Sequence, residues 1–128
     1  MQTLPLASRH VVIFSANPET LDGLEAYLCS VGFQAKGRRQ LDASSGLTSA
    51  STLAIVLFPD DFPWDAVIAT VGALAAKSTS TLRVLVTGEP KKYEHLIAGR
   101  KNFVVVPRPI WGWTILDAIR SHQGVGVA

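Results

Sequence analysis

Four short apolar runs constrain the fold of this 128-residue chain more than any other feature. They occupy residues 11–14, 53–58, 82–86 and 103–106 and are rich in Val, Ile and Leu. They lack the alternation of apolar and polar residues that marks a strand with one solvated face, so they suit strands buried on both faces of a parallel sheet. A weaker strand at residues 34–39 carries Lys36, Arg38 and Arg39. These charges suit a sheet edge because they discourage pairing with another chain.

Helical patterns separate the apolar runs. Asn17, Pro18 and Glu19 are an N-cap, a first-turn proline and a first-turn acid, and apolar residues then recur at helical spacing as far as Gly32. Further helices are predicted at 64–77, with Ile68 on the apolar stripe, and at 90–98 and 113–122. Residues 42–52 are rich in Ser, Thr and Gly, so a helix there would be short or poorly formed. Strands that alternate with helices predict an α/β fold with helices on both faces of a parallel sheet.

Composition excludes several classes of protein. Hydrophobic residues make up 48% and charged residues 17%, which excludes a disordered or acidic tail protein. The net charge of +2 is too small to indicate nucleic-acid binding. A single cysteine cannot form an internal disulfide, no apolar stretch approaches the roughly 20 residues of a membrane span, and residues 1–9 lack a signal-peptide core. We expect a soluble cytoplasmic chain with one domain over residues 1–128, a core over 9–122 and a loose tail.

Ligands of open parallel sheets bind at the carboxyl ends of the strands. The segments expected at those ends are Ser15-Ala16-Asn17, Pro59-Asp60-Asp61, Thr87-Gly88 and Arg108-Pro109.

The order and spacing of these segments resemble the receiver domain of two-component response regulators. The resemblance implies a flavodoxin-like, doubly wound sheet of five parallel strands in the order 2-1-3-4-5. Receivers carry an acid pair after the first strand, a phosphate-accepting Asp after the third, a Ser or Thr after the fourth and Lys-Pro after the fifth. The acids hold Mg²⁺, and the aspartate attacks the phosphodonor. By this resemblance Thr87 takes the place of the hydroxyl residue, and Arg108-Pro109 takes the place of Lys-Pro.

The early receiver motifs are missing. Ser15 and Ala16 stand at the acid pair, and neither supplies the carboxylate oxygens that Mg²⁺ prefers. The family spacing from the acceptor to the loop proline is four residues, and counting back from Pro63 reaches Pro59, which has no nucleophile. We therefore expect a degenerate receiver (a pseudo-receiver) with no metal site, no cofactor and no enzymatic activity.

Alternatives remain open at these loops. Asp60 and Asp61 lie just beyond the acceptor position, so one of them could act if the register slipped, or both are solvated carboxylates of a proline-bounded loop. Thr87 either keeps the family role or caps backbone at a strand end. Arg108 either contacts phosphate or is a solvated cation.

The segment that leads into the last helix is the most suggestive surface feature. Ile110, Trp111 and Trp113 are expected to form a partner surface together with Tyr93 and Val105. The alternative is that a tryptophan folds inward to fill the space left by the short second helix. Trp64 is expected to close the third loop over the vacant phosphate pocket.

Other side-chain groups give weaker signals. His10, His95, His122 and Cys29 show no metal-ligand spacing, and Cys29 is expected to be a small core residue. The basic residues at 36–39 and 91–101 lack interleaved aromatics, so we do not expect a nucleic-acid site.

The sequence thus predicts a phosphorylation-independent protein-interaction module in signal transduction. Its partner is a signalling or regulatory protein or a second copy of the chain. It is bound through the last strand (residues 103–106) and the fourth and fifth predicted helices (residues 90–98 and 113–122). One alternative is a phosphoacceptor that uses Asp60 or Asp61. Another is a module that binds a phosphate or nucleotide through Ser15, Thr87, Gly88 and Arg108 without chemistry.

Overall fold

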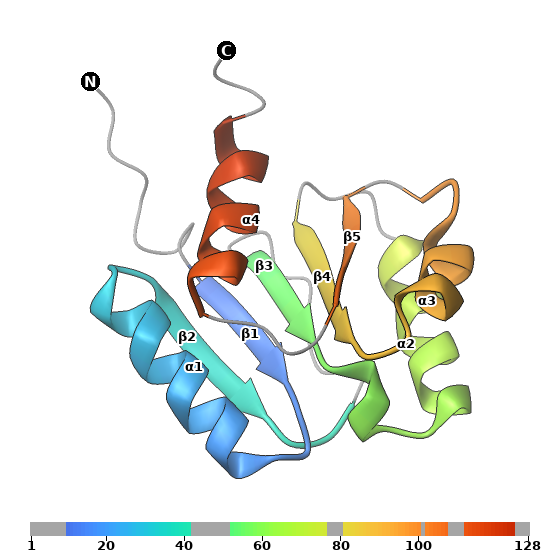
Figure 1. The fold of residues 1–128 in the computed structure, drawn as a ribbon, viewed down its shortest axis with the longest axis horizontal. Coiled ribbons are helices and arrows are strands. Elements are labelled where there is room, and N and C mark those ends of the chain that lie inside the picture. Colours follow the sequence, from blue (N-terminus) through green and yellow to red (C-terminus); the bar gives the residue numbers. More distant parts are fainter. Residues whose placement is uncertain (1–9, 42–51, 77–80, 101, 108–111, 125–128) are drawn as a thin grey trace.

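The computed structural model describes residues 10–41, 52–76, 81–100, 102–107 and 112–124. The predicted sheet is confirmed, with five parallel strands in the order β2-β1-β3-β4-β5 (Figure 1). The strands are β1 (His10–Phe14), β2 (Gln34–Arg38), β3 (Thr52–Leu57), β4 (Leu82–Thr87) and β5 (Phe103–Pro107). The helices are α1 (Pro18–Ser30), the short 3₁₀ helix η2 (Pro59–Asp61), α2 (Trp64–Ala75), α3 (Pro90–Ile97) and α4 (Gly112–Gly124). A short or poorly formed helix was predicted within residues 42–52, of which residues 42–51 lie outside the described residues.

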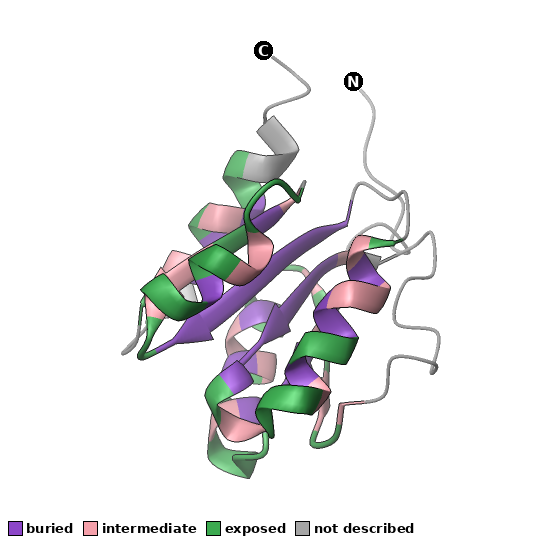
Figure 2. Cartoon of the chain, turned by 90° about the vertical axis from the view of Figure 1, so that its right-hand side faces the viewer, coloured by how far each residue is buried: buried purple, intermediate pink, exposed green. Residues whose placement is uncertain are grey.

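Two hydrophobic clusters lie on opposite faces of the sheet. Val11 and Ile13 of β1 pack with α1 and α4, whereas Phe14 of the same strand packs with α2 and α3. Successive side chains of a strand point to opposite faces, so a strand covered on both faces is apolar throughout. Figure 2 shows these buried strands between helices whose outer faces are exposed. The doubly wound arrangement predicted from the apolar runs is therefore confirmed.

The start of α1 follows the sequence prediction. The side-chain oxygen of Asn17 accepts hydrogen bonds from the backbone N–H groups of Glu19, at 2.9 Å, and Thr20, at 3.4 Å. These bonds satisfy donors that have no partner within the first turn of a helix. Gly32 follows the helix with a φ of 99°, a conformation that glycine adopts without strain.

The β2 edge of the sheet is guarded by charge and by α1. The carboxylate of Glu25 in α1 accepts a hydrogen bond from the backbone N–H of Gly37 at 2.8 Å. A Cβ atom at Gly37 would collide with this carboxylate and touch the side chain of Leu21. Together with the exposed Lys36, this contact limits pairing of β2 with another chain.

Two predictions about buried side chains are wrong. Ile68 is 39% exposed, because Val67, Val71 and Leu74 are the residues that α2 turns toward the sheet. Cys29 is exposed, because its neighbour Leu28 occupies the buried position of that helical turn.

Arg83 of β4 is a buried cation that sequence reasoning missed, with an exposed fraction of 3%. Its Nη2 donates to the backbone oxygen of Leu74 at 2.9 Å, which satisfies a carbonyl near the end of α2. The guanidinium lies 5.0 Å from the centre of the Phe103 ring. Burial lowers the pKa of Arg83 from its ordinary value. None of the helices within the described ranges is long and apolar enough to cross a membrane.

Candidate functional site

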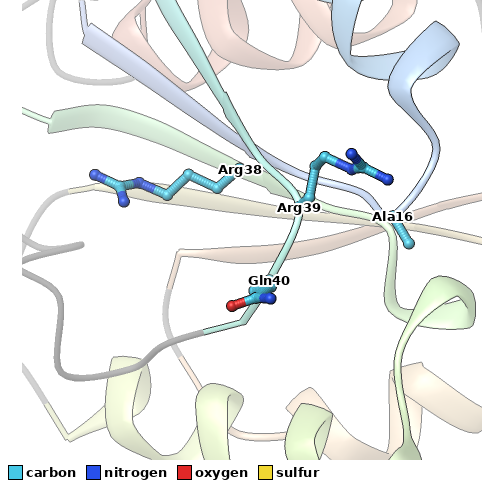
Figure 3. Close-up of a pocket in the computed structure, with 4 residues that line it drawn as sticks. All are labelled: Ala16, Arg38, Arg39 and Gln40. Atoms are coloured by element: carbon cyan, nitrogen blue, oxygen red, sulfur yellow. The ribbon is translucent and has the colours of Figure 1, made fainter.

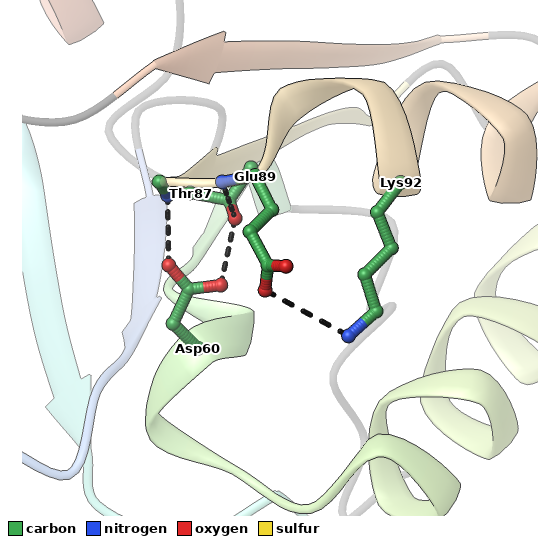
Figure 4. Close-up of polar contacts among 5 residues, drawn as sticks. Asp60, Thr87, Glu89 and Lys92 are labelled. Carbon is green, nitrogen blue, oxygen red and sulfur yellow. Dashed lines mark hydrogen bonds and ion pairs between the residues drawn. The ribbon is translucent and has the colours of Figure 1, made fainter.

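Two adjacent carboxylates in η2 connect the carboxyl ends of three neighbouring strands. β3 lies between β1 and β4, and η2 follows β3 after Phe58. Asp61 reaches toward β1, where Ser15 Oγ donates to its Oδ2 at 2.6 Å and the N–H of Ala16 donates to the same oxygen at 3.1 Å. Asp60 reaches toward β4 (Figure 4), where Thr87 Oγ1 donates to its Oδ1 and the N–H of Gly88 donates to its Oδ2, both at 2.7 Å. The carboxylates thus tie the third loop to the loops on either side.

The two hydroxyl groups that bind these carboxylates have the same local geometry. Ser15 and Thr87 are both fully buried. Ser15 Oγ accepts the N–H of Asn17 at 3.1 Å, and Thr87 Oγ1 accepts the N–H of Glu89 at 3.0 Å. Each hydroxyl therefore caps the backbone two residues further on while it donates to a carboxylate. For Thr87, this contact agrees with the alternative in which the hydroxyl caps backbone at a strand end, and the family role of Thr87 stays a prediction.

The repeated pattern has a sequence signal that was missed. A hydroxyl residue stands at the strand end, as the last residue of β4 (Thr87) or directly after β1 (Ser15). A proline starts the next helix three residues later, in Ser15-Ala16-Asn17-Pro18 and in Thr87-Gly88-Glu89-Pro90. β3, which lies between β1 and β4 in the sheet, is followed by the consecutive acids Asp60 and Asp61. This pattern indicates that each of the two acids binds one of the two hydroxyl groups.

The interpretation of Asp60 and Asp61 as merely solvated carboxylates is wrong. Asp60 is exposed and Asp61 is half-buried, but both accept hydrogen bonds from neighbouring loops. Pro59, which stands at the position counted for the phosphate acceptor, is buried at the start of η2. Among the described residues, no three His, Cys, Asp or Glu side chains are grouped so that they could hold a metal ion.

Trp64, which was predicted to close the third loop over the phosphate pocket, makes its ring contacts with residues of α3. Its ring packs against Tyr93, with centroids 5.5 Å apart, and Lys92 Nζ lies 4.4 Å from the centre of the Trp64 ring. Lys92 is also paired with Glu89 at 3.8 Å (Figure 4). Trp64 remains 39% exposed.

Tyr93 is 3% exposed, so its assignment to a partner surface is wrong. Most residues of α3 are polar, and Tyr93 is the buried residue through which this helix packs against the sheet. Burial first, and then the negative charges of Asp60 and Glu89, raise the pKa of the Tyr93 phenol. Val105 is half-buried against the same cluster.

The remaining predicted site residues are not placed by the structure. Arg108, Pro109, Ile110 and Trp111 lie outside the described residues. Trp113 belongs to α4, but its side chain is not described.

No protein-family model matches the chain, and no curated protein matches it. Several solved structures are similar to the chain in fold. A signal receiver domain of an HD domain-containing protein from Pseudomonas fluorescens is similar with a TM-score of 0.69 and 16% identity, over 95% of this chain and 90% of that one. A response regulator receiver domain protein from Clostridium thermocellum is similar with a TM-score of 0.61 and 11% identity, over 91% of this chain and 95% of that one.

The chain has the receiver-domain fold. A pilus assembly-related protein from Burkholderia pseudomallei is also similar, with a TM-score of 0.66 and 15% identity, over 97% of this chain and 96% of that one. At these identities the likeness establishes the fold, and function has to be argued from the residues of the receiver fold's loops and surfaces.

Proposed function

We propose that this chain is a receiver-like domain that signals by binding a protein partner and not by phosphorylation. The observation that carries the proposal is that the acids nearest the acceptor position are bound to neighbouring loops. Both oxygens of Asp60 accept hydrogen bonds from the loop after β4, and Oδ2 of Asp61 accepts two from the loop after β1. The proposal places the domain in the cytoplasm and treats it as a signalling module, not an enzyme.

The missing acid pair supports the same proposal. Phosphoryl transfer to a carboxylate depends on a divalent cation that neutralises the charge developing on the phosphoryl oxygens. Ser15 and Ala16 stand where receivers carry the metal-binding acids, and the Ser15 hydroxyl donates its proton to Asp61. A hydroxyl that donates to a carboxylate lowers the negative potential there, whereas a second carboxylate would raise it.

A partner surface is supported on the β5 edge of the sheet. β5 is an edge strand without a charged residue, in contrast to the guarded edge at β2. Val104 is 37% exposed and pairs in register with Val84, a member of the cluster covered by α1 and α4. Val104 therefore faces the same side of the sheet as α4, the helix that contains Trp113. An apolar, uncharged edge is the kind of strand that pairs with another chain unless something covers it.

The test compares two equally exposed apolar residues on different elements. Val104→Lys places a charge on the β5 edge, and Ile68→Lys places the same charge on α2, where the residue is 39% exposed. We expect Val104→Lys to reduce self-association in sedimentation, or capture of partner proteins by the immobilised chain, while Ile68→Lys does not. Equal behaviour of the two variants would contradict the assignment of the surface. A phosphodonor with Mg²⁺ should leave the association unchanged.

A displaced phosphoacceptor is a second candidate, favoured by the contact between Asp60 and Thr87. A carboxylate that touches the hydroxyl residue of the fourth strand lies on the correct side of the third loop for the receiver reaction. In that case a small phosphodonor with Mg²⁺ adds one phosphoryl group to the chain, and Asp60→Asn abolishes the gain in mass.

A further inference from the structure

A hollow of about 700 Å³ opens at the carboxyl ends of β1 and β2. Among the described residues it is lined by Ala16, from the loop between β1 and α1, and by Arg38, Arg39 and Gln40 at the end of the edge strand (Figure 3). Ligands of open α/β sheets bind at this end of the strands, and small-molecule sites typically have volumes of about 300–1,000 Å³. The hollow therefore has the place and the size of a ligand site.

The cations at this hollow lack acidic partners within the described part of the chain. Neither the Arg38 nor the Arg39 guanidinium forms a hydrogen bond or an ion pair with another described residue. The Nε atom of Arg38 is buried without an acceptor there. Buried N–H groups almost always have an acceptor, because an unsatisfied donor opposes folding. The Nε atom itself is closed to solvent, so a ligand would supply acceptors to the exposed Arg39 and to the outer nitrogens of Arg38.

The charges around the hollow favour an anion. Asp61 touches the loop at Ala16, but its Oδ2 is already bound by Ser15 and by the N–H of Ala16. α1 begins two residues after Ala16, and the amino end of a helix carries a partial positive charge. Glu19 in the first turn of α1 opposes this charge, but it is exposed to solvent.

We propose that this hollow binds a nucleotide-sized small molecule that carries several phosphate groups. Arg38, the last residue of β2, and Arg39, directly after it, point in different directions (Figure 3). An elongated anion that passes the strand end therefore reaches both, while a compact one reaches a single guanidinium. The guanidinium fork matches phosphate oxygens, and the Gln40 amide offers a donor and an acceptor for an uncharged part of the ligand. The site uses none of the bonds that hold Asp60 and Thr87, so it does not depend on the proposed function.

The experiment is calorimetric titration of the full chain with ATP, ADP and inorganic phosphate as separate probes. Arg39→Gln removes the exposed guanidinium, and Arg38→Gln removes the half-buried one. Lys36→Gln is the matched control, because it removes one positive charge from the same strand at an exposed position outside the lining of the hollow. Unfolding of each variant without ligand shows whether it is folded, and the exposed Arg39 keeps the test valid if Arg38→Gln destabilises the chain.

We expect saturable binding of ATP or ADP that each arginine variant weakens by about tenfold, as for the loss of one charged hydrogen-bonding group. Lys36→Gln should weaken it by less than about twofold, as expected for screened charge at a distance. The proposal is overturned if no probe binds, or if Lys36→Gln weakens binding as much as Arg39→Gln does. It is also overturned if inorganic phosphate binds as tightly as ATP, because the site would then be one for a compact anion.

Discussion

Asp60 provides a direct test of how the loops are held, because both of its oxygens accept hydrogen bonds from the loop after β4. Asp60→Ala removes both acceptors and leaves the buried Thr87 hydroxyl without the oxygen to which it donates. A hydrogen bond to a charged group contributes about 1.5–3 kcal/mol, and competition from water at the exposed Asp60 reduces that value. We expect the free energy of unfolding to fall by about 2 kcal/mol.

Thr87→Val completes a thermodynamic cycle with this variant. Valine nearly keeps the shape of threonine and removes only the hydroxyl, so the double variant isolates the bond between Thr87 and Asp60. Residues in direct contact usually show coupling energies of about 0.5–3 kcal/mol. A single hydrogen bond of 2.7 Å to a partly solvated carboxylate should give a coupling energy of about 1 kcal/mol.

The assay is urea unfolding at neutral pH, followed by tryptophan fluorescence and by circular dichroism. Asp22→Ala is the control, since Asp22 is an exposed acid of α1 that lies away from the three loops. We expect it to change the free energy of unfolding by less than about 0.5 kcal/mol. A coupling energy near zero would show that the bond between Thr87 and Asp60 does not hold the loops in solution.

Two further predictions concern the sheet edge and α3. Gly37→Ala should lower the free energy of unfolding by about 1–2 kcal/mol in the same urea assay, because its Cβ meets the Glu25 carboxylate and a buried leucine; an unchanged midpoint would contradict this. The raised pKa of Tyr93 stabilises the fold below about pH 10, and this contribution is lost at higher pH because the unfolded phenol ionises first. Tyr93→Phe should therefore reduce the alkaline fall in the thermal midpoint, and an identical fall in both proteins would show that another group causes it.

The sheet was predictable because its strands are buried on both faces, which leaves short apolar runs without polar alternation in the sequence. The start of α1 was predictable for a similar reason, since Asn17, Pro18 and Glu19 act within one helical turn. Both are local patterns, and distant contacts do not change them. The strand order came from the resemblance to receivers and agrees with the structure.

The individual side chains at the site were less predictable, because their positions depend on contacts between distant elements. Asp60 and Asp61 are adjacent in sequence, but the 3₁₀ turn directs their side chains to the ends of different strands. Asp60 binds Thr87, which lies 27 residues later in the sequence, and Asp61 binds Ser15, which lies 46 residues earlier. Arg83 is a charged residue inside an apolar strand, and its guanidinium is satisfied there by a backbone carbonyl near the end of α2. Nothing in the local sequence shows that acceptor.

Intact-mass spectrometry after incubation with a small phosphodonor and Mg²⁺ shows whether the chain accepts a phosphoryl group. We expect the mass of the wild-type chain to stay unchanged. The acids beside Pro59 are held by neighbouring loops, and under the proposed function Ser15 and Ala16 stand at the positions of the metal-binding acid pair. A gain of one phosphoryl group that Asp60→Asn or Asp61→Asn abolishes, and that Asp22→Asn leaves intact, would contradict the proposed function.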